Sequence, residues 1–165
     1  MSQQLVGELQ QESATTRRVL ERVPAEKLEW RPHRTSMTLG QLAMHVAVIP
    51  DAIAQLAQRE GFDAAQANFD PPQPKDKKEI LDAFERSVTS AQGYLSGLTG
   101  DSAAQTWRLT SKGREVFSVP RSGLLRSVML NHWYHHRGQL SVYLRMLEVP
   151  MPVIYGRSAD EDPFA

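Results

Sequence analysis

Histidines are the side chains in this sequence with the clearest potential for chemistry. There are five, His33, His45, His132, His135 and His136, and the last three lie in the short segment NHWYHHRGQL. Histidine is the commonest metal-binding side chain in proteins. Helical bundles often build metal sites in their core from side chains on facing helices. The segment with three histidines therefore indicates a metal site.

The spacing of these histidines limits which of them can act together. Two ligands on one helix must be three or four residues apart, and His132 has this spacing with both His135 and His136. At about 100° per residue, His136 lies roughly 25° from the centre of the apolar face and His135 roughly 75° from it. That face is defined by Leu125, Val128, Met129, Gln139, Tyr143 and Leu147. We expect His132 and His136 to point inward, and His135 to lie at the bundle edge or against a partner subunit.

A third ligand must come from another helix, and His45 is the candidate because it lies in the apolar stretch LAMHV. His33 follows a proline in a connecting segment, where we expect it to be exposed. Other interpretations of the same residues remain open. His45 can be a hydrogen-bonded core or boundary histidine, and His132 and His136 an ordinary pair between core and surface. All three can then be polar residues of a helical dimer that binds no metal.

Four helices are predicted to position these side chains. Apolar residues at spacings of three and four indicate helices over about 3–22, 39–56, 76–98 and 122–147. Ser36 or Thr38 can cap the second helix, and Asp76 the third. Pro50 predicts a kink or break in the second helix, because proline lacks a backbone donor. Residues 60–76 are expected to form a loop, and the polar tail from Tyr155 to lie over the bundle surface.

These elements predict an all-α fold, a four-helix bundle with a long loop or short hairpin before the last helix. The hairpin is placed between 100 and 120, around Ser111-Lys112-Gly113. The chain has 165 residues, which is the size of one domain, so we expect a single domain over 1–165. The clearest alternative is a helical domain that dimerises through one of its apolar faces.

Composition excludes several classes of function. The chain has no cysteine, which rules out disulfides, thiolate metal sites and a cysteine nucleophile. Its 19 basic residues balance 19 acidic ones, so no overall field favours nucleic acid or an anionic membrane. No apolar run approaches the ~18 residues of a membrane span, and the N-terminus lacks the apolar core of a signal peptide. We expect a cytoplasmic protein that binds neither nucleic acid nor membrane.

One acidic residue interrupts the apolar face of the first helix. Glu12, followed one turn later by Thr16, points close to the core by the same helical geometry. A carboxylate on the core side is unfavourable unless it is paired. Glu12 is therefore a candidate catalytic residue, either as an acceptor for the N–H of a ligand histidine or as a proton acceptor from bound water. The alternative is that Glu12 lies at the end of the bundle and reaches solvent.

The segment from His132 to Leu140 resembles the H-x-x-x-H-R-G-Q signature of the DinB/YfiT-like superfamily, the damage-inducible metalloproteins rather than the polymerase of the same name. The stretches LEWRP (28–32) and TLGQLAMH (38–45) are similar to the region around that family's first histidine, and Val149-Pro150 and residues 155–161 resemble one subgroup. The resemblance implies a four-helix bundle, often a homodimer, that holds a divalent metal on His45, His132 and His136. It also implies kinship with thiol-dependent transferases and isomerases and with amide-hydrolysing metalloenzymes.

Such a site leaves a coordination position open, which favours Lewis-acid chemistry and a bound water of lowered pKa. Zn or Ni suits an all-nitrogen site best, and Fe or Mn also fits. We therefore expect a metal-dependent hydrolase or S-transferase that activates water or an exogenous low-molecular-weight thiol against a small electrophile. The alternative is a non-catalytic, stress-associated module that binds a metal or a ligand. Arg137 is expected to form an ion pair or interface contact, and Gln139 and Tyr143 to line the pocket.

Overall fold

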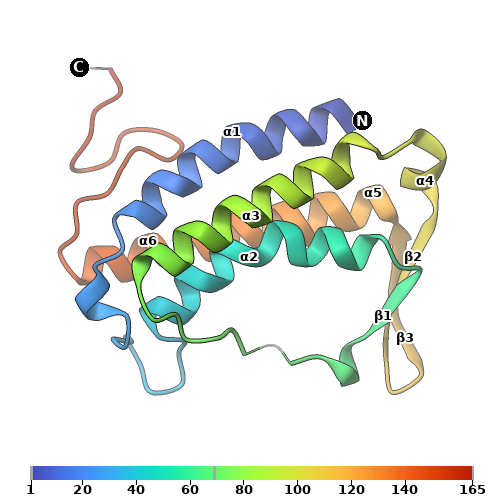
Figure 1. Cartoon of the computed structure of the whole chain (residues 1–165), viewed down its shortest axis with the longest axis horizontal. Coiled ribbons are helices and arrows are strands. Elements are labelled where there is room, and N and C mark those ends of the chain that lie inside the picture. Colours follow the sequence, from blue (N-terminus) through green and yellow to red (C-terminus); the bar gives the residue numbers. More distant parts are fainter. Residues whose placement is uncertain (1, 69, 165) are drawn as a thin grey trace.

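Four long helices pack side by side in the computed structural model, which describes residues 2–68 and 70–164 (Figure 1). Three are single α-helices, and the fourth consists of three consecutive stretches, the middle one a π-helix. The helices are α1 (Ser2–Glu21), α2 (Leu39–Ala57), α3 (Lys77–Ser96) and the last helix, which runs through α5 (Arg121–Leu124), η3 (Leu125–Leu130) and α6 (Asn131–Met146). The four predicted helices are confirmed, with small differences at their ends.

Helix α2 packs against α3, α6 and η3. Contrary to the expectation that no segment approaches a membrane span, α2 is long and apolar enough to cross a membrane by length and composition. More than half of it, however, is buried among the other helices. Its first turn is closed by a capping box, in which Thr38 Oγ1 accepts from the Gln41 N–H and Gln41 Oε1 accepts from the Thr38 N–H, both at 3.0 Å. Thr38 is therefore the cap, rather than Ser36. The predicted cap of α3 at Asp76 is also found.

Helix α2 continues through Pro50 without a break. Proline has no N–H, so the carbonyl of Val46, four residues earlier, loses its partner within the helix. The indole Nε1–H of Trp133 on α6 donates to this carbonyl at 2.8 Å, and the hydrogen bond is buried. The helix therefore tolerates its proline because a neighbouring helix satisfies the freed carbonyl.

A small three-stranded sheet joins the helices at one end of the bundle (Figure 1). Its strands are β1 (Gly61–Asp63), β2 (Thr106–Ser111) and β3 (Arg114–Pro120), with β1 parallel and β3 antiparallel to the central β2. The predicted hairpin is confirmed as β2 and β3, whose turn holds Lys112 and Gly113 at positive φ, as a two-residue hairpin turn of type I′ requires. Three short helices complete the secondary structure of the described residues: η1 (Ala25–Lys27), η2 (Ala64–Gln66) and α4 (Gly100–Ala104).

The sheet corrects two expectations. The fold is mostly helical but not purely all-α, and residues 60–76 contain β1 and a 3-10 turn rather than only a loop. Strand β1 forms because Gly61 allows a close approach, since a Cβ atom there would lie 2.5 Å from the Arg108 carbonyl oxygen. Buried Trp107 on β2 fastens the sheet to α2, because its Nε1–H donates to the Leu56 carbonyl at 3.0 Å.

The π-helix changes which face of the last helix is buried. A π turn adds one residue to the helical turn. The buried positions therefore shift from Leu125 and Met129 within η3 to a new set that begins at its last residue, Leu130, and continues on α6 with Trp133, Arg137, Leu140 and Leu144. The predicted face, extrapolated at a constant angle, is wrong in this region. Trp133 and Arg137 are buried, while His132 and His136 lie on the half-buried flank beside them.

A buried ion pair connects α1 to α6. Arg137 Nη2 lies 2.6 Å from Glu12 Oε2, and Arg137 Nη1 donates to Thr16 Oγ1 at 2.9 Å. The hydroxyl of Tyr155, from the C-terminal tail, donates to the same Glu12 oxygen at 2.9 Å. Glu12 and Thr16 thus face the core as predicted, and the ion pair expected for Arg137 is found. Glu12 does not reach solvent at the end of the bundle, because its partners enclose it.

The C-terminal tail lies over the bundle and is held by ionic contacts, as expected. Glu161 pairs with Arg18 on α1 and with Arg22 directly after it, and Asp160 pairs with Arg145 on α6. These pairs are partly exposed, so each contributes little on its own. Together with Tyr155 they close the tail over the Glu12–Arg137 pair.

The Glu12–Arg137 pair yields a stability prediction. Replacing Glu12 by Gln preserves the shape of the side chain but leaves a buried guanidinium without a counter-charge. We expect Glu12→Gln to lower the free energy of unfolding by about 3–5 kcal/mol in urea denaturation. The control is Glu21→Gln on the same helix, where the lost ion pair with Arg17 is exposed and we expect a change of about 1 kcal/mol or less. Equal losses in the two variants would contradict a structural role for the buried pair.

Candidate metal centre

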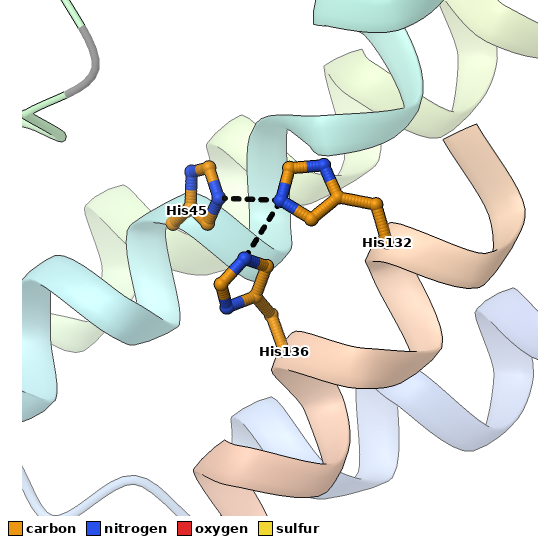
Figure 2. A group of neighbouring side chains, drawn as sticks. All are labelled: His45, His132 and His136. Carbon is orange, nitrogen blue, oxygen red and sulfur yellow. Dashed lines mark hydrogen bonds between the residues drawn. The ribbon is translucent and has the colours of Figure 1, made fainter. Parts of the chain in front are cut away.

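Three histidines from two helices converge on one point between α2 and α6 (Figure 2). His45 comes from α2, and His132 and His136 are one turn apart on α6. His132 Nε2 lies 3.4 Å from His45 Nε2 and 2.7 Å from His136 Nε2. One ligand nitrogen of each side chain falls within 4.8 Å of the other two. The structure thus brings together the three histidines that the sequence singled out.

The donor set fits a divalent ion. Two imidazole nitrogens that share a tetrahedral ion at about 2.0–2.1 Å are separated by about 3.3 Å. The distance between His45 and His132 is close to this value, at 3.4 Å. The shorter contact between His132 and His136, at 2.7 Å, is a hydrogen bond that holds one proton between two nitrogens. A bound ion would replace that proton, because only an unprotonated nitrogen can act as a ligand.

Gln139 orients one of the ligands. Its Oε1 lies 2.7 Å from His136 Nδ1. An amide oxygen only accepts, so this contact assigns the proton to Nδ1 and leaves the lone pair of Nε2 facing the other histidines. Such a partner fixes the tautomer and ring orientation of a metal ligand. We expected Gln139 to line the pocket but did not predict its contact with His136. The i, i+3 spacing of the two residues could have indicated it.

The surroundings favour neutral imidazoles at pH 7. Burial, with smaller contributions from neighbouring histidines, lowers the pKa of His45 and of His132 to about 4 in each case. Burial also lowers the pKa of His136, although its hydrogen bond to Gln139 acts in the opposite direction. Among the residues that the structure describes, no carboxylate belongs to this cluster. The site therefore offers three neutral nitrogen donors and no negative charge.

The other candidate residues lie elsewhere. His135 and His33 are exposed, as expected, and His33 contacts Thr35. Tyr143 packs edge-on against Trp30, with ring centroids 5.7 Å apart, and its hydroxyl donates to the Met37 carbonyl at 3.4 Å. It is a packing residue with a satisfied hydroxyl.

Glu12, the predicted catalytic residue, is not part of the histidine cluster. Its carboxylate is bonded to Arg137 and Tyr155, on the buried side of α6, whereas the histidines occupy the neighbouring flank. In this structure Glu12 is bonded to Arg137 and Tyr155 and to none of the three ligand histidines. The helical spacing indicated the correct face of α1 but did not identify the partner.

Comparisons with known proteins agree with the geometry. The chain is 25% identical over 150 residues to YrdA, an uncharacterized protein of Bacillus subtilis, and the match covers 91% of this chain and 85% of that protein. The fold of this chain is similar to the crystal structure of a DinB-like protein from Bacillus cereus (TM-score 0.71, 23% identity, 92% of this chain and 95% of the other). It is also similar to the DinB-like protein YjoA of Bacillus subtilis (TM-score 0.68, 19% identity, 91% and 96%).

A further structural relative is a putative member of the DinB family from Exiguobacterium sibiricum (TM-score 0.65, 21% identity, 92% and 95%). These structural likenesses, below 25% identity, concern the fold alone. The family model described as DinB family matches residues 1–162, which is nearly the whole chain. The chain therefore belongs to the DinB family.

Proposed function

We propose that this chain is a metal-dependent enzyme in which His45, His132 and His136 hold a divalent ion and activate water or an exogenous low-molecular-weight thiol. The reaction would be hydrolysis of, or thiol transfer to, a small electrophilic substrate. The observation that supports the proposal is the convergence of three imidazoles on one point without a carboxylate among them. Zn or Ni suits this nitrogen donor set best, and Fe or Mn remains compatible with it.

A divalent ion in this place would supply Lewis acidity and lower the pKa of a bound water or thiol. The chain itself contributes orientation and access. Gln139 holds the proton of His136 at Nδ1, so that Nε2 is free to bind. The three histidines are only partly buried, which leaves the site open to a molecule from solvent. Their neutrality leaves the charge of the ion uncompensated, which favours an anionic ligand such as a thiolate.

The source of the thiol follows from composition. The chain has no cysteine, so a thiol nucleophile must come from a cosubstrate. The proposal includes a cytoplasmic location, where small thiols are kept reduced. A homodimer is also part of the proposal. Sedimentation analysis would test the oligomeric state.

Metal content is the first prediction for this site. Untagged protein purified without chelator is expected to contain about one equivalent of a divalent transition metal by elemental analysis. His136→Ala removes one of the three donors and should lose the metal. The matched control is His135→Ala, which removes the exposed neighbouring histidine and should retain it. The metal site would be refuted if wild-type protein reconstituted with several divalent ions held none.

The lowered histidine pKa values give a second prediction. In the unfolded chain, histidine titrates near pH 6.5, at about its ordinary pKa. Folded His45 and His132 titrate near pH 4. Between about pH 6.5 and 4 the unfolded metal-free chain therefore binds protons that the folded chain does not, so stability falls as the pH is lowered.

Urea denaturation of EDTA-treated protein at pH 7 and pH 5 measures this effect. The loss of stability should be smaller in His132→Ala, which lacks one of the histidines whose pKa is lowered. A loss of the same size in His132→Ala as in the wild type would contradict the lowered pKa of His132.

Catalysis is tested by assaying metal-loaded protein with small thiols and electrophiles, and with simple amides and esters. Turnover by the wild type and its loss in His136→Ala would support the enzyme. Stoichiometric metal with no turnover across this panel would favour the alternative of a non-catalytic metal-binding or ligand-binding module.

A further inference from the structure

One buried hydrogen bond connects the two helices that supply the histidines. The Trp133 indole Nε1–H donates to the Val46 carbonyl at 2.8 Å, and both residues are fully buried. Trp133 follows His132 directly on α6, and Val46 follows His45 directly on α2. The bond therefore fixes the two backbones to each other at the level of the ligands.

The bond exists because of Pro50. In a regular helix the Val46 carbonyl would accept from the N–H of residue 50, which proline lacks. A buried carbonyl without a partner is costly, so this position attracts a donor from outside the helix. Pro50 is itself buried at the same junction. The proline and the tryptophan thus act as a matched pair on opposite helices.

We propose that the Pro50–Trp133 pair is a positioning device for the metal site, which sets the distance and orientation between His45 and His132. This inference rests on the proposed function, because it concerns residues that act through the ligands. Neither Pro50 nor Trp133 contacts the ion position. Trp133 acts through the backbone of α6, and Pro50 acts by leaving the Val46 carbonyl free.

The junction between α2 and α6 has few other directional contacts. Among the described side chains, the one other hydrogen bond between these helices is the contact of His45 with His132, which an ion would replace. The π-helix lies immediately before α6, so the start of α6 is not held by a regular ladder of hydrogen bonds. On its other side, the Trp133 ring packs near Phe84 of α3, with centroids 6.3 Å apart. The indole is therefore held from both sides.

The chain contains a matched control for this bond. Trp107 is also buried, and its Nε1–H also donates to a carbonyl of α2, that of Leu56 at 3.0 Å. This second bond lies at the C-terminal end of α2, where the partner is the sheet rather than α6. Trp107→Phe and Trp133→Phe each remove an indole N–H that donates to a carbonyl of α2, but only Trp133 lies beside the histidines.

The experiment is a titration of metal-free protein with Co²⁺, followed by the visible absorption bands that report coordination geometry. Trp133→Phe is expected to weaken Co²⁺ binding by about 10–100-fold, the usual effect of removing a group that orients metal ligands, and to change the spectrum. Trp107→Phe should lose stability to urea but keep the wild-type affinity and spectrum. Wild-type affinity and spectrum in a folded Trp133→Phe variant would overturn the inference.

A second variant approaches the same bond from the other helix. Pro50→Ala restores an N–H that competes for the Val46 carbonyl and keeps the tryptophan. We expect weaker Co²⁺ binding and faster hydrogen exchange of the Trp133 indole proton. Unchanged values for both would overturn the inference even if Trp133→Phe did not fold. If the wild-type protein bound no Co²⁺ at all, the proposed function would fail instead, so the two failures are distinguishable.

Discussion

The contact between α2 and α6 is the constraint on which the candidate site depends. Helix α2 brings one ligand and α6 brings two, and His45 and His132 are 87 residues apart in the chain. Three imidazoles can share an ion only if the two helices keep a fixed distance and rotation. Core packing of Trp133, Leu140 and Leu144 supplies the attraction between α6 and the bundle, since buried apolar surface is the main favourable term in folding. Packing alone is not directional, which is why the hydrogen bond at Val46 matters.

The last helix separates two kinds of polar group on adjacent faces. Its buried face carries Arg137, whose charge is balanced by Glu12 and surrounded by Tyr134 and Tyr155, with the guanidinium carbon 5.2 and 5.1 Å from their ring centroids. Its half-buried flank carries the two histidines. The carboxylate of Glu12 is therefore paired with Arg137. Among the described residues, no carboxylate belongs to the histidine cluster. A divalent ion bound there would keep its Lewis acidity, because no anionic protein ligand reduces it.

Much of the fold and site could be predicted from the sequence, because the signals are local. Apolar residues at spacings of three and four located the four helices. The capping residues Thr38 and Asp76 located the starts of two of them. The histidine set followed from the i, i+4 spacing together with the motif. What the sequence did not reveal depends on contacts between distant segments. Strand β1 forms only by pairing with β2, which begins 45 residues later in the chain, at Thr106 against Gly61. The partner of Glu12 on α1 is Arg137 on α6.

The π-helix explains why the predicted buried face of the last helix was wrong, although the predicted histidines do converge. The residue types of 125–130 do not indicate an extra residue in the helical turn. An extrapolation at a constant angle per residue therefore placed Arg137 outside the core, whereas it is buried. His132 and His136 still point toward His45, but from the flank of α6 rather than from its buried centre. This placement has a functional consequence. A site at the flank is accessible from solvent, whereas a site at the centre of the bundle would be closed.

X-ray absorption spectroscopy at the edge of the bound metal tests the central claim most directly, since it reports the ligands themselves. We predict three imidazole nitrogens at about 2.0–2.1 Å from the metal, with the remaining coordination filled by light atoms that a small thiol can replace with sulfur. Addition of the thiol should then produce a sulfur shell at about 2.3 Å. A coordination sphere with fewer than three imidazoles, or one closed by a carboxylate of the protein, would contradict an open three-histidine centre.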